Sequence, residues 1–387
     1  MQNAVEFITL ELRPRLRSCN VFIAMRDDVC SKNVRIKILE SNIVLTLKDH
    51  SVSFSLPSVK VIPTSLSVLS VMSNWICFRL QTAPLDTVFG SFNTEVVTDS
   101  EIRSEVRSNV VCSPPVLEDL KLLCKTSECV MLCACCKNVI SKSISFKRFL
   151  PVPDTDYDPN EWFCCNHNSN ITATDLQPRD SDYLYTSCFS LMHKSIFKST
   201  AYLDNGTLTC GKCLLHIGTL YKNGLYKIWN CCVDHEAQSD TSSPSTVNAT
   251  DPLNDFLLLV RDSLSEILGE EIVLQTCVGR QSHCLLIKPM DHKLNLITEP
   301  SRKIPGDTDT ILLQQKCVTK VLYKYETSRV SAAVTVNYST TKYYEVGLPI
   351  IEAGLKYLLL STKRLPHVYR TVVTDYFLGY IVSQEVN

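Results

Sequence analysis

The sequence predicts an α+β protein with an antiparallel β domain at its N-terminus, a central module built on four cysteines, and a mixed α/β domain at its C-terminus. Three observations predict this fold class. Short alternating runs rich in β-branched residues fill residues 1–110. Residues 111–235 hold 13 of the 19 cysteines. Residues 251–387 combine helical stripes with alternating runs, and the polar segment 236–250 before them has the composition of a flexible linker.

The N-terminal region contains five runs in which apolar and polar residues alternate, and polar turn residues separate most of them. The runs are 21–24, 34–38, 43–47, 52–56 and 75–80. Strands at this spacing are typical of an antiparallel sandwich or an open barrel. Because no constellation of catalytic residues stands out here, we interpret this region as a packing and docking domain.

The C-terminal region is expected to contain both helices and strands. Asp251 and Pro252 predict the start of a helix, because aspartate is a favoured N-cap and proline fits the first turn. Apolar residues at helical spacing follow, and Gly269 marks the stop, so we predict a helix over 252–268 whose stripe faces the core. The remaining predictions are strands at 271–277, 283–287 and 318–325, a helix from Pro349 through Leu359, and a strand over the tail 368–383.

Composition and charge exclude several classes of function. The net charge is −1, so no broad basic surface for nucleic acid is expected, and the 11 glycines form no nucleotide-binding motif. No apolar run reaches the ~20 residues of a membrane-spanning helix, and the first residues do not resemble a secretory signal. We therefore expect a protein of the cytoplasm and nucleus that acts away from membranes. In that reducing environment its cysteines are metal ligands, buried thiols or a reactive thiol rather than disulfides.

Two C-x-x-C pairs indicate a zinc site. Cys133 and Cys136 form the first pair, and Cys210 and Cys213 form the second. Each pair suits a tight turn that directs two sulfurs to one point, and an apolar run follows each turn, so the two turns together supply four thiolates for a structural Zn²⁺. Residues 137–209 separate the pairs, which is more than the usual spacing of a compact finger, so the fold must bring them together. Cys135 is interpreted as a bystander.

A second cysteine-containing motif follows an acidic, proline-containing segment that predicts a loop at 153–160. The motif reads Glu161-Trp162-Phe163-Cys164-Cys165-Asn166-His167. The imidazole of His167 is placed to lower the pKa of Cys165 and make it a nucleophile. The same side chains are also competent ligands for a metal, including one held by a partner, and Cys164 is equally compatible with an inert thiol buried beside Trp162. The spacing alone leaves these alternatives open.

The order of these motifs resembles the family of HECT-like proteins that bind ubiquitin-conjugating enzymes. The shared order is a β-rich start, a C-x-x-C pair, a Leu-Pro-x-Pro loop at 150–153, a Trp-Cys-Cys-His motif, the segment 185–192, a second C-x-x-C pair, and a C-terminal α/β region whose last long helix opens at Leu348-Pro349. The resemblance covers most of the chain. It implies ubiquitin-protein ligase activity, a ubiquitin-conjugating enzyme and ubiquitin as partners, and cyclin-type substrates. Some members are tied instead to the metal-dependent endonuclease of messenger-RNA 3′-end processing.

Two departures from the family pattern bear on the catalytic residues. One extra residue stands on each side of the Cys-Cys pair, which changes the geometry of thiol and imidazole. No cysteine follows Cys317, whereas a true HECT ligase carries its acceptor cysteine near the C-terminus. If ubiquitin forms a thioester with this chain, Cys165 is the candidate nucleophile and His167 the group that activates it.

Three hypotheses follow. The first is a ligase that accepts ubiquitin on Cys165 and passes it to a substrate lysine. The second is a non-catalytic ligase or scaffold in which the zinc module fixes the fold and the region 236–387, with the helix at 252–268, holds the conjugating enzyme. The third is an assembly factor or inhibitor of a metal-dependent nuclease, in which the Cys-Cys-x-His loop reaches the metal of the partner.

Overall fold

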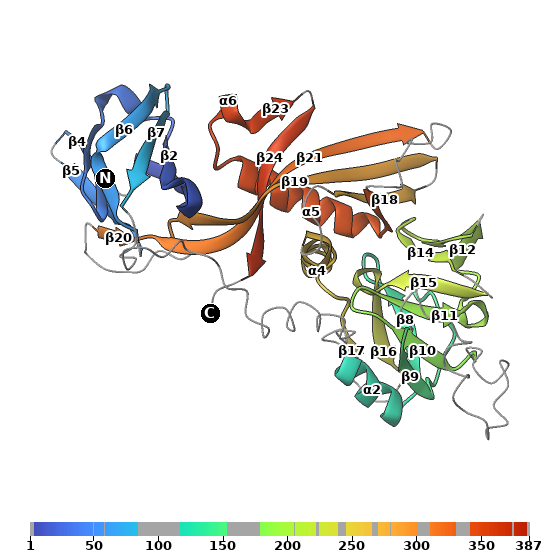
Figure 1. The fold of residues 1–387 in the computed structure, drawn as a ribbon. Helices are drawn as coiled ribbons and strands as arrows, with labels where there is room; N and C mark the ends of the chain where they lie inside the picture. The colour runs from blue at the N-terminus through green and yellow to red at the C-terminus, as the bar shows by residue number, and fades with distance from the viewer. Residues whose placement is uncertain are drawn as a thin grey trace, which may run out of the picture.

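The computed structural model describes the following residues: 4–48, 50–57, 59–83, 117–152, 179–204, 206–221, 224–238, 245–264, 270–278, 280–300, 310–329, 341–373 and 375–384. Within them the strands form four sheets, and few helices accompany these sheets (Figure 1). This confirms the predicted α+β class, with antiparallel strands first, a cysteine-rich β module in the middle, and helices combined with strands at the C-terminal end.

The largest sheet has ten strands and joins the two ends of the chain. Its main path runs β23-β24-β21-β19-β1-β2-β7-β6, and β18 and β22 extend it beside β19. The strands are β1 (Val5–Arg13), β2 (Ser18–Met25), β6 (Val61–Val71), β7 (Trp75–Thr82), β18 (Glu271–Val278), β19 (Gln281–Thr298), β21 (Gln314–Arg329), β22 (Thr341–Glu345), β23 (Thr371–Val373) and β24 (Tyr376–Gln384). β19 and β21 are long enough to cross from the C-terminal strands to the N-terminal ones (Figure 1).

A four-stranded sheet completes the N-terminal region, and one of its strands comes from the C-terminal half of the chain. It consists of β3 (Arg35–Ile38), β4 (Asn42–Leu47), β5 (His50–Ser55) and β20 (Thr310–Leu312). β20 pairs in parallel with β5, and β1 pairs with the end of β19. The N-terminal apolar core therefore includes Ile297 and Leu313. Nothing in the local sequence pattern indicates this exchange between regions 1–110 and 251–387.

The central cysteine-rich module consists of two sheets. Seven strands form the larger sheet: β9 (Arg148–Pro151), β10 (Asp182–Tyr185), β11 (Phe189–His193), β12 (Ala201–Asp204), β13 (Thr207–Cys210), β14 (His216–Leu220) and β15 (Leu225–Trp229). The smaller sheet contains β8 (Cys129–Cys133), β16 (Val233–Ala237) and β17 (Thr246–Val247). The described ends of the predicted linker 236–250 thus lie in β16 and β17, which pair antiparallel. This pairing satisfies backbone groups that a free linker would leave to water.

The helices are α2 (Leu117–Thr126), α4 (Pro252–Leu264), α5 (Leu348–Thr362) and the short α6 (His367–Arg370), with 3₁₀ turns at Pro14–Leu16, Ser31–Asn33, Lys194–Ile196 and Asn230–Cys232. α4 begins where Asp251 predicts it, because the Asp251 side chain accepts a hydrogen bond of 3.0 Å from the backbone N–H of Leu253. The tail differs from the single strand predicted over 368–383. Pro366 starts the turn of α6, and two antiparallel strands, the three-residue β23 and the nine-residue β24, follow it.

The apolar stripes of α4 and α5 pack against each other rather than face solvent. Phe256 and Val260 of α4 are fully buried, as are Ile350 and Leu358 of α5. A Cβ atom added at Gly354 would lie 2.4 Å from the Phe256 ring, so glycine is required where the two helices meet. This packing agrees with the predicted core stripe of α4, whereas in α5 the buried face is centred on Ile350, Gly354 and Leu358, and Leu359, the end of the predicted stripe, is 43% exposed.

Candidate metal centre

The first C-x-x-C pair forms a tight turn at the end of β8. The backbone N–H of Cys133 donates to the carbonyl of Asn138 at 2.9 Å, and the N–H of Lys137 donates to the carbonyl of Cys133 at 2.8 Å. Lys137 adopts a left-handed backbone conformation, with φ of 57°. These bonds close a turn from which both sulfurs of the pair point to one place. The Lys137 ammonium also forms a 2.6 Å salt bridge with the buried Asp234, which attaches the turn to β16.

The second pair repeats the same local geometry at the end of β13. The N–H of Cys210 donates to the carbonyl of Leu215 at 2.9 Å, and the N–H of Leu214 donates to the carbonyl of Cys210 at 2.9 Å. Leu214 is left-handed as well, with φ of 61°. In both turns the residue directly after the second cysteine is left-handed, so the two turns have the same local geometry. They follow strands of different sheets.

The two turns bring the four cysteines together. The Sγ atoms of Cys133, Cys136, Cys210 and Cys213 all lie within 4.8 Å of one another. The pairs Cys133–Cys213 and Cys136–Cys210 are 3.6 and 3.5 Å apart. These distances are too long for disulfides. Four sulfurs bound tetrahedrally to one zinc at about 2.3 Å would lie about 3.8 Å apart, so this donor set fits Zn²⁺.

The surroundings of Cys210 favour the thiolate that a metal requires. Burial raises the pKa of the Cys210 thiol, but the backbone N–H groups of Cys213 and Lys212 outweigh burial and lower this pKa to about 6. The Lys212 N–H lies 3.5 Å from the sulfur, and the amide of Asn138 lies 3.6 Å from it. Backbone N–H groups directed at a sulfur are the usual outer contacts of a thiolate metal site.

The neighbouring cysteines do not enlarge this group. Cys135 is exposed and stands outside it, in agreement with its interpretation as a bystander. The spare candidates form two separate pairs: Cys124 and Cys129, 3.6 Å apart, and Cys231 and Cys232, 3.9 Å apart. Among the described residues, the four C-x-x-C sulfurs make up the single group of three or more metal-ligating side chains.

The segment that carries the second motif joins two strands, β9 and β10, of the seven-stranded sheet. Cys164, Cys165 and His167 lie in 153–178, outside the described residues. On either side of this segment, β9 and β10 pair in parallel, and Arg148 forms a bidentate salt bridge of 2.8 and 2.5 Å with Asp182. Burial raises the pKa of Asp182, but Arg148 and the Arg179 N–H outweigh burial, so the net shift is downward. Both ends of the segment are therefore fixed to the sheet that carries Cys210.

The comparison with protein families decides what kind of protein this is. Residues 11–376 match the family described as HECT-like ubiquitin-conjugating enzyme (E2)-binding. The chain belongs to this family. The match spans nearly the whole chain and confirms the resemblance inferred from the order of the motifs. Comparison with curated proteins and with solved structures gives no significant match. None of the described helices has the length and apolar character to cross a bilayer.

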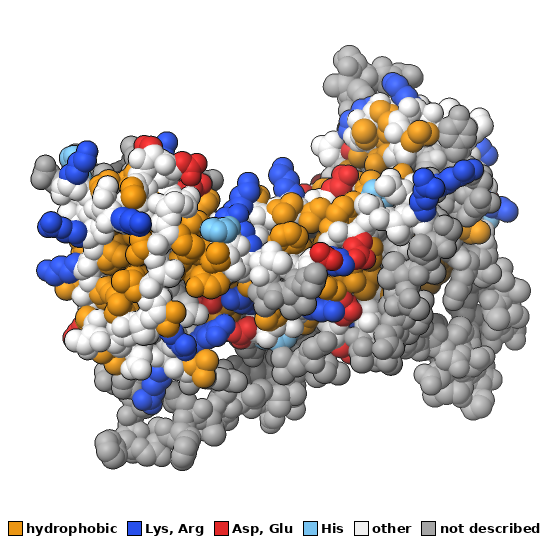
Figure 2. Space-filling view, turned by 90° about the horizontal axis from the view of Figure 1, so that it is seen from above, with side chains coloured by type: hydrophobic (Ala, Val, Ile, Leu, Met, Phe, Trp, Pro, Cys, Tyr) orange, Lys and Arg blue, Asp and Glu red, His pale blue; other side chains and the backbone are white. Residues whose placement is uncertain are grey.

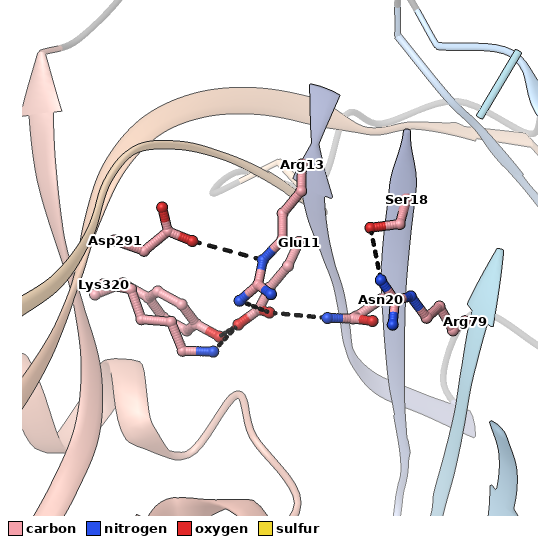
Figure 3. A network of polar contacts seen from close by, with 8 residues as sticks. Glu11, Arg13, Ser18, Asn20, Arg79, Asp291 and Lys320 are labelled. Atoms are coloured by element: carbon pink, nitrogen blue, oxygen red, sulfur yellow. Dashed lines mark hydrogen bonds and ion pairs between the residues drawn. The ribbon is translucent and has the colours of Figure 1, made fainter. Parts of the chain in front are cut away.

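Within this HECT-like E2-binding chain, sequence analysis missed one group of polar residues. Glu11 is buried in the ten-stranded sheet and is contacted by Lys320, Tyr380 and Asn20 (Figure 3). The four side chains come from β1, β21, β24 and β2, which are far apart in the sequence. The one available signal was Glu11 itself, a charged residue within the run 5–13 of mostly apolar residues. A buried carboxylate requires a partner, so its presence there indicates a polar contact from another part of the chain.

Proposed function

We propose that this protein is an E3 ubiquitin-protein ligase that binds a ubiquitin-conjugating enzyme and promotes transfer of ubiquitin to protein substrates, with cyclins as the substrate class to test first. The observation that carries the proposal is the match of residues 11–376 to the HECT-like E2-binding family. The four-cysteine group supports it, because a structural Zn²⁺ on Cys133, Cys136, Cys210 and Cys213 would join two sheets of the central module.

In the proposed mechanism, Cys165 accepts ubiquitin. The Cys165 thiolate attacks the carbonyl carbon of the thioester between the conjugating enzyme and ubiquitin. A new thioester forms on Cys165, and the cysteine of the conjugating enzyme leaves as a thiolate. His167 takes the proton of the Cys165 thiol before attack. The amine of a substrate lysine then attacks the new thioester, an amide bond forms, and Cys165 is released.

The burial of the other cysteines favours a nucleophile outside the packed sheets. Among the described cysteines, three are exposed: Cys30, Cys135 and Cys277. Burial raises the pKa of the Cys284 thiol to about 11 and that of Cys77 to about 12, so these thiols are poor nucleophiles at neutral pH. A transferring cysteine must be accessible to a second protein, which buried thiols of this kind are not.

The structure bears on the alternative in which the helix at 252–268 holds the conjugating enzyme. Phe256 and Val260 of α4 are buried against the core, so the apolar stripe of this helix is occupied. An E2 contact through α4 would have to use the face around Asn254, which is the one exposed position among the described residues of this helix. Substitutions on that face are therefore a sharper test than deletion of the helix, because deletion would also remove part of the core.

Binding and ligase activity are tested with the full-length chain. A panel of conjugating enzymes is titrated by calorimetry, and the best binder is then used with ubiquitin, activating enzyme and a cyclin. We expect saturable binding of at least one conjugating enzyme and chain-dependent ubiquitination of the cyclin. If no conjugating enzyme in the panel binds, the ligase proposal fails. Binding without ubiquitination would leave an E2-binding scaffold and remove the cyclin assignment.

A further inference from the structure

A cavity of about 430 Å³ opens on one face of the ten-stranded sheet, between the N-terminal strands and α6. Its floor carries side chains of β1, β2, β7, β21 and β24, and its walls are formed by β6 on one side and by residues 365–371 on the other. Figure 1 shows β6 and α6 standing on either side of this part of the sheet. The volume lies in the range of pockets that bind ligands. We refer to it as the sheet cavity.

The floor of the sheet cavity is polar, and its single carboxylate is already neutralised. Glu11 accepts hydrogen bonds from Lys320 at 2.5 Å, Tyr380 at 2.6 Å and Asn20 at 3.3 Å (Figure 3). Burial raises the pKa of Glu11, but Lys320 and the hydrogen bonds outweigh burial and lower it. Glu11 is therefore ionised, with its charge matched by Lys320, and it offers no attraction for a cationic ligand.

Besides Glu11 and Lys320, the lining contains two arginines, of which Arg13 has carboxylate partners and Arg79 has none among the described residues. Arg13 lies 3.5 Å from Asp291 and 3.8 Å from the shared carboxylate of Glu11. Arg79 is exposed, and its guanidinium donates at 3.1 Å to the hydroxyl of Ser18; among the described residues it forms no salt bridge (Figure 3). The lining thus contains three cations and one carboxylate, and the uncompensated charge sits at Arg79.

The walls of the sheet cavity are apolar and exposed at their rims. Phe22 on the floor meets Tyr369 on one wall, with ring centroids 6.0 Å apart. Val368 is 52% exposed on that wall, and Val68 is 70% exposed on the opposite one. Outside the cavity lining, β6 also exposes Leu66 and Leu69. Figure 2 shows hydrophobic side chains gathered over the N-terminal strands on this face.

Val68 is also held in a strained conformation. Its φ of 52° places a β-branched residue in the left-handed region, which such residues rarely adopt. The pairing of β6 with β7 is irregular around this position, with register shifts between Ile62 and Ser67 and between Ser67 and Ser70. Strain of this kind persists where the surroundings enforce it, and it concentrates at binding and switch sites. Here the left-handed residue is one of those that line the cavity.

We propose that the sheet cavity is a docking site for a short peptide segment of a protein partner, in which apolar side chains flank an acidic one. The apolar side chains pack against Val68, Val368 and Tyr369, and the carboxylate pairs with Arg79. The exposed Leu66 and Leu69 of β6 favour a peptide, because they lie outside the lining that a ligand confined to the cavity would cover. The site is independent of the zinc cluster and of the proposed ubiquitin transfer.

The test uses the full-length chain and three fluorescein-labelled peptides. The first alternates Leu, Val and Phe with Asp and Glu, the second carries Lys in place of the acidic residues, and the third carries Ser in place of the apolar ones. We expect the first peptide to bind at least about tenfold more tightly than either of the others in fluorescence anisotropy. Absence of binding by the first peptide, or equal binding of all three, would overturn the proposal.

Matched variants locate the contact. Arg79→Glu is expected to abolish the preference for the acidic peptide, whereas Arg35→Glu, a charge reversal at an exposed position of β3, should leave it unchanged. Val68→Gly removes the wall side chain and permits the positive φ, so the thermal midpoint should stay the same or rise while peptide binding weakens. Equal effects of Arg79→Glu and Arg35→Glu, or full binding by Val68→Gly, would contradict the assignment.

Discussion

Removal of one cysteine from the four-cysteine group tests the metal centre most sharply. In Cys210→Ser the second turn loses the thiolate whose Sγ lies 3.5 Å from that of Cys136, a residue 74 positions earlier. Because the four-thiolate site forms only in the folded chain, the free energy of metal binding adds directly to the free energy of unfolding. We therefore expect the central module to lose its metal together with most of this free energy, which is on the order of 10 kcal/mol for structural zinc sites.

The assay combines metal content with urea unfolding. Zinc bound per chain is measured by plasma mass spectrometry, and unfolding is followed by fluorescence, because Trp229 is buried in the same core as the cluster. Cys135→Ser is the matched control: Cys135 stands in the same turn as Cys133 and Cys136 but is exposed and outside the group. The control should keep both its zinc and its midpoint.

The reasoning would be refuted by a Cys210→Ser variant that retains the metal and unfolds like the wild type. It would also be refuted if Cys135→Ser lost metal to the same extent as Cys210→Ser. A wild-type chain that is purified without zinc and binds none when zinc is added would remove the metal centre altogether, and the four thiols would then be a packing cluster.

Three further predictions concern the packed regions. Burial raises the pKa of Asp255 from 3.8 to about 7, so between about pH 4 and pH 7 this carboxyl ionises in the unfolded chain but stays protonated in the folded one, and stability falls as pH rises. Asp255→Asn should therefore be more stable than wild type at pH 8, by roughly 4 kcal/mol, and lose this advantage near pH 4 in urea unfolding. Gly354→Ala should lower the thermal midpoint, because its Cβ would lie 2.4 Å from the Phe256 ring; an unchanged midpoint would contradict the packing. Glu11→Gln should lower the free energy of unfolding by about 3–5 kcal/mol at neutral pH, because it leaves Lys320 buried without its carboxylate. The stability difference from wild type should shrink as pH falls through the lowered folded-state pKa of Glu11. A pH-independent difference would argue against an ionised Glu11.

Much of the secondary structure follows from local pattern. The helix from Asp251 and the helix from Pro349 have clear start signals and apolar stripes, and both form where the sequence predicts them. The strand run at 43–47 alternates because one face of it is buried, whereas the run at 75–80 begins with four apolar residues that are all buried. Local periodicity reports on which face of a segment is buried, whether the residues that cover this face are near or far in the chain.

The parts that local pattern does not predict depend on distant residues. The run 5–13 contains Glu11, whose burial is made favourable by Lys320, more than 300 positions away. β6 exposes apolar side chains and lacks regular alternation, so it does not read as a strand. The exchange of β20 into the N-terminal sheet and the pairing of β19 with β1 are likewise set by tertiary packing.

The candidate metal site was more predictable than the rest because its chemistry is local. Each C-x-x-C pair specifies its own turn, and the fold has only to bring two finished turns together. The Cys165 motif carries no comparable local geometry, and its role stays a prediction. The sheet cavity has no sequence signature, because its lining comes from eight separate elements.

A single-turnover experiment tests the central claim most directly. A conjugating enzyme preloaded with ubiquitin is mixed with the purified chain, and the products are separated on a non-reducing gel for the wild type, Cys165→Ser and the neighbouring control Cys164→Ser. The account predicts a ubiquitin adduct on the chain that disappears on reduction, is absent from Cys165→Ser and is retained in Cys164→Ser. No adduct on the wild type with any conjugating enzyme that binds it would contradict the transfer through Cys165 and leave the chain as an E2-binding protein without a covalent step.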